Sequence, residues 1–393
     1  MTKIDILGVV YSFQEPLLIE NVMRLVNKVQ TSINLHKERN LSLYGKIQLI
    51  KTKIFPLIFQ KLLFLPLEDS TLRKIENLLF EFLWYPENEE LVDRKQVISD
   101  YQKGGLNVVD VWSQFKAASL MKVKSIANAS SLSEFWVKFA FYIGSTLKLI
   151  NDSLYNNRQP HRTVAFDYWY RLKKLILETV DNNMNINWEE IKFKELSRKF
   201  KLINSQSANL DKPWMNIHLL GYNKFLFTNF EREVSFLVAQ DAVMCGQRRR
   251  HIERFVDIPT WTLNHCKFCK HSTDSVKHVF AGECQVIRTV FESCKALYWM
   301  TTKERLNLDN KLLLYNKVKD MKKEYLKVKL VVIMKKIIKF EKQKLDKYKT
   351  FINNKDKFIN DVMQEIRHQY MFALKTNAVY LKRGKDTHWC ILY

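Results

Sequence analysis

The sequence predicts a mainly α-helical protein that carries a small metal-binding module, and three observations lead to this prediction. Nine glycines and seven prolines in 393 residues are about 4% of the chain, against roughly 12% in an average protein. Apolar residues, 47% of the chain, recur at helical spacing in several segments. Three cysteines and three histidines gather between residues 265 and 284. The scarcity of turn-forming residues excludes a β-sandwich, a β-propeller and a glycine-rich phosphate-binding domain.

The charge balance predicts a polyanion as partner. Lysine and arginine number 64 against 41 acidic residues, a formal net charge of +23, and such a surplus attracts nucleic acid or anionic membranes. We expect no membrane insertion, because no stretch of 18 apolar residues exists. The N-terminus shows no secretion signal, and the unevenly spaced cysteines favour a reducing compartment. The chain is therefore predicted to be soluble and intracellular, with nuclear and cytoplasmic locations both open.

The N-terminal 86 residues are predicted to form one strand and a helical bundle. Residues 4–11 are a short β-branched run typical of a strand. The first helix follows Pro16, the second begins near Ser42 as N-cap and is bent or interrupted by Pro56, and the third starts after Ser70. Their apolar stripes contain Val22, Leu25, Val26, Val29, Ile33, Ile47, Ile50, Ile54, Ile58, Leu72, Ile75, Leu78, Leu79, Phe82 and Leu83. A compact bundle would bury all three stripes.

The remaining segments are predicted to be mostly helical. The pair Gly104-Gly105 predicts a turn into a short strand at Leu106 and Val108, followed by a helix through Leu120. Residues 127–240 are predicted to be helical with breaks near 151–160 and 205–213. The tail from 301 to 393 has 23 basic and 10 acidic residues.

One long amphipathic helix is predicted as the core of this tail, with lysines around a single apolar face. That face contains Leu326, Leu330, Ile333, Ile337 and Phe340. Its lysine-rich part, 321–349, is compatible with a coiled-coil partner helix, an RNA-binding arm or a plain surface helix.

A cluster with the spacing C-x2-C-x8-H-x5-C predicts a structural metal site. Cys266 and Cys269 lie two residues apart, so that both thiolates of one tight turn can face one ion. His278 falls about one turn into a short helix, and Cys284 can close a tetrahedron. Three sulfurs and one imidazole suit Zn²⁺ and leave no open position for a reacting water. The competing interpretation is a set of ordinary buried cysteines with a solvated histidine.

Other cysteines and histidines are weaker candidates as ligands. His265 and His271 flank the thiols without a spacing partner. Cys245, Cys294 and Cys390 are predicted to be small core residues or free thiols. The short helix that carries the ligand histidine is predicted to be capped at residue 274 or 275.

Several motifs, in this order, resemble the palm-to-thumb junction of non-LTR (LINE-type) retrotransposon reverse transcriptases. Leu7-Gly8-Val9 matches an L-G-[VI] strand, and residues 39–51, RNLSLYGKIQLIK, are similar to the family's R-x-L-S-x-x-G-[KR]-x-x-L-I-K motif. FLW at 82–84 and KGGLNVVD at 103–110 resemble its F-L-W and K-G-G-L-x-x-x-D signatures. The cysteine cluster, with Asp274-Ser275 and an H-x-F at His278, resembles the family's zinc-binding module, although the last gap is one residue longer.

The resemblance implies a domain order of five parts. These are the end of a palm-like strand (1–15), a thumb-like helical bundle (16–126), a helical connector (127–244), a zinc-binding CCHC module (245–300) and a basic helical tail (301–393). The resemblance rests on specific motifs over residues 4–125 and is looser over 214–292.

Departures from the family pattern affect the expected activity. Reverse transcription needs carboxylates that hold two metal ions, supplied in this family by an [FY]-x-D-D strand, and this chain has no Asp-Asp pair. That strand would fall before Met1, so we expect a C-terminal part of such an enzyme, without catalytic residues and inactive alone. The nuclease motif Pro-Asp of some relatives is also absent from the sequence. The alternatives are a zinc-stabilised protein-interaction scaffold, or half of a split polymerase completed by a fingers–palm polypeptide.

The resemblance also implies contacts to an RNA or DNA template–primer. Arg39, Lys46 and Lys51 stand at matched basic positions, and the run Arg248-Arg249-Arg250 is the densest local charge. Phe268, between two thiols, is predicted either to stack on a base or to pack on the metal module.

Overall fold

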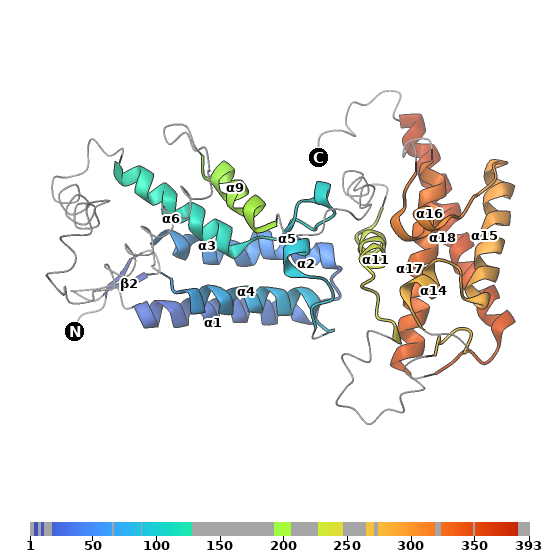
Figure 1. Ribbon diagram of the computed structural model, residues 1–393, viewed down its shortest axis with the longest axis horizontal. Coiled ribbons are helices and arrows are strands. Elements are labelled where there is room, and N and C mark those ends of the chain that lie inside the picture. The colour runs from blue at the N-terminus through green and yellow to red at the C-terminus, as the bar shows by residue number, and fades with distance from the viewer. Residues whose placement is uncertain are drawn as a thin grey trace.

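The computed structural model describes residues 4–6, 9–11, 18–64, 67–87, 89–127, 192–205, 227–246, 265–270, 274–318, 324–348 and 350–383. These parts of the chain are mainly helical, which confirms the predicted fold class. Figure 1 shows two groups of helices with α11 between them. We call the group formed by residues 18–127 and 192–205 the N-terminal unit, and the group formed by the described residues from 265 to 383 the C-terminal unit.

The first residues form a small hairpin, so the prediction of one strand over residues 4–11 was wrong. β1 (Ile4–Ile6) pairs with β2 (Val9–Tyr11) in antiparallel register. The run therefore supplies its own partner for backbone hydrogen bonds. Asn21 attaches the hairpin to the first helix, because its side chain accepts from the Val10 N–H and donates to the Val10 carbonyl, both at 2.8 Å.

The helices of the N-terminal bundle follow the predicted stripes. They are α1 (Leu18–Lys37), α2 (Leu43–Leu49), α3 (Phe55–Phe64) and α4 (Asp69–Trp84). Ser42 caps α2 as predicted, accepting from the Gly45 N–H at 3.2 Å. A π-helical turn, η1 (Ile50–Ile54), separates α2 from α3. The predicted interruption of the second helix is therefore confirmed, and it lies just before Pro56, which has no N–H to continue a regular α-helix.

The segment after the double glycine is irregular, so the predicted strand at Leu106 and Val108 was wrong. It lies between α5 (Arg94–Ile98) with the short turn η2 (Tyr101–Lys103) and the helix α6 (Val111–Ala127). The N–H groups of Leu106 and Val108 both donate to the Val97 carbonyl, which no strand ladder would do. A Cβ on Gly105 would lie 2.1 Å from the Ser99 carbonyl oxygen, so this close approach requires glycine.

Helices from the predicted connector pack on both units. α9 (Phe193–Ser205) packs against α6, and α11 (Asn229–Ala239) packs against α2 and α17. A capping box at Thr228 and Glu231 fixes the start of α11. The predicted breaks near 151–160 and 205–213 lie almost entirely outside the described residues, and the domain boundaries remain predictions.

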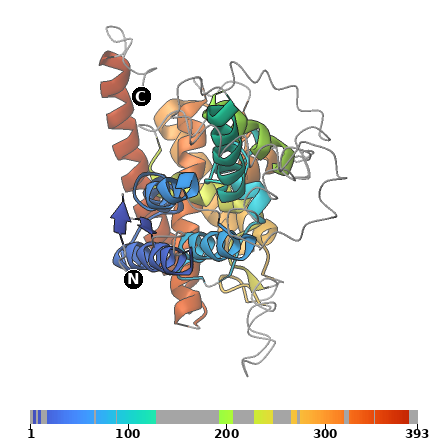
Figure 2. The same ribbon diagram turned by 90° about the vertical axis from the view of Figure 1, so that its left-hand side faces the viewer.

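The C-terminal unit corrects the prediction of one long tail helix. It contains α14 (Val276–Phe280), α15 (Gln285–Thr302), α16 (Asn310–Tyr315), α17 (Tyr325–Lys347) and α18 (Lys355–Arg383). The tail thus forms two long helices and a short one, and Figures 1 and 2 show them packed beside the helices that precede residue 301.

α17 is the central helix of this unit and not a lysine-covered surface helix. It packs against α11, α15, α16 and α18. Its buried apolar residues are Val328, Leu330, Val331, Val332, Ile333, Met334, Ile337 and Ile338. Phe340, predicted on the buried face, is 57% exposed, whereas Lys329, Lys335 and Lys342 are buried. None of the helices in the described ranges has the length and apolarity required to span a bilayer.

Candidate metal centre

Three local structures present the four predicted ligands. Residues 266–270 form a tight turn, in which the Lys270 N–H donates to the Cys266 carbonyl at 2.9 Å. Ser275 caps α14 and accepts from the His278 N–H at 3.0 Å, which confirms the predicted capped helix. Cys284 stands at the N-cap of α15, and its N–H donates to the His278 carbonyl at 2.9 Å. Hydrogen bonds to the backbone therefore hold the segments that carry the four ligands, and one of these bonds joins Cys284 directly to His278.

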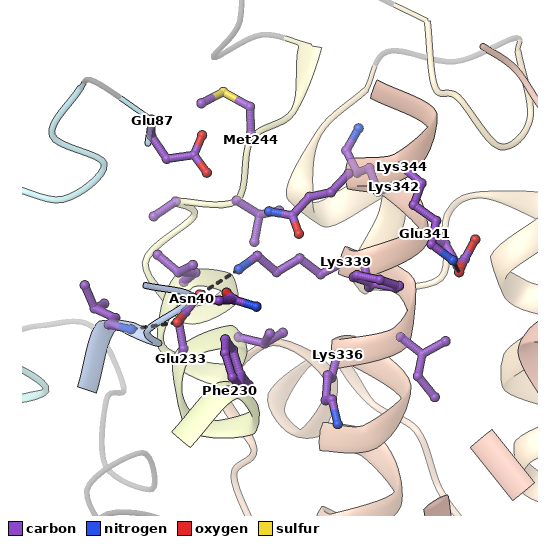
Figure 3. A pocket seen from close by; sticks show the side chains of 18 of the residues that line it. Asn40, Glu87, Phe230, Glu233, Met244, Lys336, Lys339, Glu341, Lys342 and Lys344 are labelled. Carbon is purple, nitrogen blue, oxygen red and sulfur yellow. Dashed lines mark hydrogen bonds and ion pairs between the residues drawn. The ribbon is translucent and has the colours of Figure 1, made fainter. Parts of the chain in front are cut away.

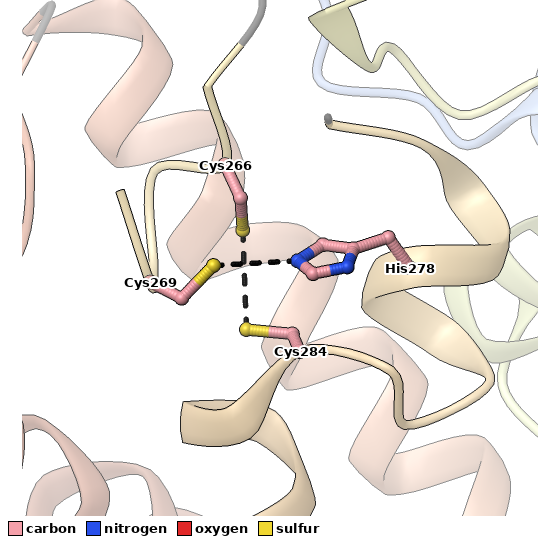
Figure 4. Close-up of side chains that lie close together, drawn as sticks. All are labelled: Cys266, Cys269, His278 and Cys284. Atoms are coloured by element: carbon pink, nitrogen blue, oxygen red, sulfur yellow. Dashed lines mark hydrogen bonds between the residues drawn. The ribbon is translucent and has the colours of Figure 1, made fainter. Parts of the chain in front are cut away.

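The four side chains converge on one point (Figure 4). One ligand atom from each of Cys266, Cys269, His278 and Cys284 lies within 4.8 Å of all the others, and all four residues are buried. The Sγ atoms of Cys266 and Cys284 are 3.9 Å apart, and Cys269 Sγ lies 3.4 Å from His278 Nε2. This cluster could hold a metal ion.

Hydrogen bonds within the cluster redistribute its protons. The hydrogen bond with Cys284, together with burial, raises the pKa of the Cys266 thiol, and the same bond lowers the pKa of Cys284. Hydrogen bonding with Cys266 raises the pKa of His278 to about 9. Because a metal binds thiolate and neutral imidazole, the affinity of this cluster for a metal should rise with pH.

The other cysteines take the predicted structural role where the structure describes them. Cys245 and Cys294 are buried and stand apart from the cluster. Burial raises the pKa of the Cys294 thiol to about 12, which makes it unreactive at neutral pH. His265 is not among the converging ligands, whereas His271 and Cys390 lie outside the described residues.

A buried ion pair joins the segment that carries the predicted metal ligands to α17. No sequence pattern indicated this pair. Asp274 Oδ2 accepts from Lys342 Nζ at 2.5 Å and from the Gly246 N–H at 2.9 Å. The two side chains are 2% and 1% exposed. Apolar residues are unusually dense in α17, which was a signal that its lysines would be enclosed. The acidic partner of Lys342 could not be predicted in the same way, because Asp274 lies 68 residues away in the sequence.

The three matched basic residues have different environments. Arg39 is exposed. Lys46 is buried, and its ammonium donates to the carbonyl oxygens of Leu83 and Tyr85. Lys46 therefore has a structural role, because it binds carbonyl oxygens at the end of α4, and its predicted contact with a phosphate is corrected.

Lys51 is half-buried, with its Nζ 6.0 Å from the centre of the Tyr101 ring. Burial, with the nearby charge of Lys201, lowers its pKa to about 8. This lysine therefore carries a weaker positive charge at mildly alkaline pH than an exposed one.

Of the two roles predicted for Phe268, the structure favours packing over base stacking. Its ring is 0% exposed and lies 5.5 Å, centre to centre, from the ring of Phe358 on α18. A ring enclosed in this way cannot stack on a base, so packing on the metal module is its role. Arg248, Arg249 and Arg250 lie outside the described residues.

Comparisons with known proteins do not assign a family. No protein-family model matches this chain, and no curated protein matches it.

Proposed function

We propose that the cysteine–histidine cluster is a structural zinc site. Zn–S bonds of about 2.3 Å and a Zn–N bond of about 2.0–2.1 Å in a tetrahedron put two sulfurs about 3.8 Å apart and a sulfur and nitrogen about 3.5 Å apart. The corresponding distances here are 3.9 Å and 3.4 Å. Soft thiolates with one imidazole are the donor set that zinc prefers, and a full shell of four protein ligands supports folding rather than hydrolysis.

We further propose that the chain binds nucleic acid, as its resemblance to the thumb, connector and zinc module of non-LTR reverse transcriptases implies. The observation that carries this proposal is the convergence of Cys266, Cys269, His278 and Cys284, which stand in the order of that family's zinc module with a last gap one residue longer. The net charge of +23 supports it independently. We do not assign polymerase activity to the chain alone, because its sequence has no Asp-Asp pair.

Binding of fluorescent oligonucleotides to the purified, zinc-loaded chain tests this proposal. Affinity should fall by roughly 10³-fold or more between ~50 and ~200 mM salt if six or more phosphates are neutralised. Absence of binding at ~50 mM salt would contradict it. A primer-extension assay with a homopolymer template should show no incorporation, and robust incorporation would overturn the assignment of an inactive chain.

A protein-interaction scaffold is the second candidate function. Trp299 and Met300, neighbours near the end of α15, are 53% and 51% exposed, and such apolar side chains favour contact with another protein. A scaffold would bind an acidic protein tightly and show little affinity for RNA or DNA even at low salt. The same salt titration therefore separates the two functions.

A further inference from the structure

A groove of about 960 Å³ lies where the two units meet. Its lining comes from α11 and residues 242–244 after it, from α17 and α18, from residues 40–46, and from the segment at the end of α4. Figure 3 shows Lys339 extending from α17 to Glu233 on α11. Glu233 also accepts from the Leu43 N–H at 2.8 Å, so one carboxylate ties α11 to both units. We call this the α11–α17 groove.

A stripe of alternating cationic and aromatic side chains runs along the α17 wall. Lys336, Phe340 and Lys344 are four residues apart, so they follow one face of the helix over about 12 Å. Lys344 Nζ lies 4.5 Å from the centre of the Phe340 ring. Phe340 is 57% exposed, and Phe230 from α11 is 43% exposed in the same groove. Two large rings are therefore available for a ligand.

The groove is lined by five lysines and five carboxylates, and several of these charges are paired. Glu233 is engaged by Lys339 at 2.9 Å, and Glu341 is engaged by Lys344 at 2.7 Å. Lys336 donates to the amide oxygen of Gln369 at 3.1 Å, and this neutral acceptor does not cancel its charge.

Carboxylates also line the groove at Glu87, Asp361 and Glu365. They would repel a closely applied double helix, whose outer surface presents phosphates. Carboxylates can, however, accept hydrogen bonds from the amino groups of unpaired bases.

We propose that the α11–α17 groove binds a single-stranded segment of nucleic acid, with bases stacked on Phe340 and Phe230 and a phosphate bound by Lys336. Aromatic platforms combined with flanking cations are the physical basis of single-strand binding, because every base offers a π-face and every nucleotide a charge. The inference rests on the proposed nucleic-acid binding and specifies the strand state and the site.

The test compares a fluorescent single-stranded 12-mer with a 12-base-pair duplex on the full-length, zinc-loaded chain. Phe340→Ala and Phe230→Ala should each weaken single-strand binding by roughly fivefold to a hundredfold, with little change for the duplex. Lys336→Gln should lower the slope of log affinity against log salt by about 0.7 for the single strand. Phe372→Ala is the matched control, since Phe372 is 69% exposed on α18 and does not line the groove.

Unchanged single-strand affinity of both phenylalanine variants, in a wild-type chain that binds oligonucleotides, overturns the groove assignment and leaves the proposed function standing. Equal losses for single strand and duplex also overturn it, because the site would then not distinguish strand state. A wild-type chain that binds neither oligonucleotide contradicts the proposed function itself. If an acidic amphipathic peptide binds with sensitivity to Phe340→Ala and the 12-mer does not compete, the groove serves a protein partner.

Discussion

The two units of this protein are stabilised in different ways. In the N-terminal unit, the stripe of Ile47, Ile50, Ile54 and Ile58 is almost completely buried, and its helices pack through apolar contacts. The C-terminal unit encloses four potential metal ligands, the Lys342–Asp274 pair and the ammonium of Lys335 within its core. Both units bury apolar side chains, and the core of the C-terminal unit depends in addition on these particular partners.

The comparison shows where single changes should matter most. Apolar burial contributes about 25 cal/mol per Å² and tolerates substitutions of similar volume. A buried charge or thiolate has no such tolerance, because loss of its partner leaves the whole desolvation cost uncompensated. We therefore expect chelator, pH and isosteric substitutions to change the stability of the C-terminal unit and to leave that of the N-terminal unit unchanged.

Loss of the metal should have the largest effect. Chelation, Cys266→Ser or Cys284→Ser removes a binding free energy on the order of 10 kcal/mol that is available only to the folded site. Amide hydrogen exchange should then lose protection over residues 265–318, whereas residues 18–127 should keep theirs. Hydrogen exchange with mass spectrometry, together with metal content, measures both quantities.

The control for this experiment is Cys294→Ala, which alters a buried cysteine outside the ligand cluster. It should retain one metal per chain and lose only packing stability. Full metal content in both serine variants would show that the assigned ligand set is wrong. Equal loss of protection in the two units would show that they unfold together.

Breaking the buried ion pair should have the second largest effect. Asp274→Asn leaves the Lys342 ammonium buried opposite a neutral amide, and the loss of one partner of such a pair costs about 3–5 kcal/mol. Asp346, at 3.5 Å from Lys342, should keep the loss near the lower end of that range. Urea unfolding of the C-terminal unit measures the change.

The double variant Asp274→Asn/Lys342→Met provides the comparison, because it removes the unpaired charge as well. It should be more stable than Asp274→Asn alone. A single variant that loses less than about 1 kcal/mol would mean that the pair does not anchor the metal-ligand segment to α17.

The N-terminal unit could largely be predicted from the sequence. Its apolar residues recur every three or four positions, Ser42 is a recognisable cap, and Pro56 marks the interruption. The failures there involve backbone pairing. Leu106 and Val108 have strand-forming side chains, but their N–H groups share one carbonyl across a close approach that only glycine allows.

The metal ligands could be predicted, whereas their surroundings could not. Two short spacings placed Cys266, Cys269 and His278 together, because ligands on one turn and one short helix need no long-range information. The partner of Asp274 is 68 residues away, on a helix whose lysines were predicted to surround a single apolar face. Sequence periodicity does not report which of the neighbouring helices covers a face, so the burial of α17 was missed and the two alternatives for Phe268 stayed open.

The buried Lys335 predicts a pH dependence of stability for the C-terminal unit. Its ammonium donates to Asn316 Oδ1 at 2.7 Å and to the Leu314 carbonyl at 3.5 Å, and burial lowers its pKa to about 7. Between pH 7 and the usual lysine pKa near 10.4, the unfolded chain holds a proton that the folded chain has released. Raising the pH should therefore stabilise the fold, by up to about 1.4 kcal/mol per pH unit from this group.

Lys335→Met should remove this part of the slope. Unfolding of wild type and variant by urea between pH 7.5 and 9 isolates the contribution of Lys335, since the other titrating groups are common to both chains. Parallel stability profiles would show that the buried ammonium keeps its proton through this range.

The smallest expected effect concerns the N-terminal unit. Ser42→Ala removes the oxygen that accepts from the Gly45 N–H and should lower the free energy of unfolding by about 1 kcal/mol. Ser70→Ala is the matched control, because Ser70 lies in the first turn of α4 without capping it and its loss should cost less than about 0.5 kcal/mol. Both values should be independent of chelator and of pH between 7.5 and 9, as measured by urea unfolding. A dependence of the Ser42→Ala effect on chelator would mean that the stability of the N-terminal bundle depends on the C-terminal unit, through α11. The two cores would then differ in composition but not in stability.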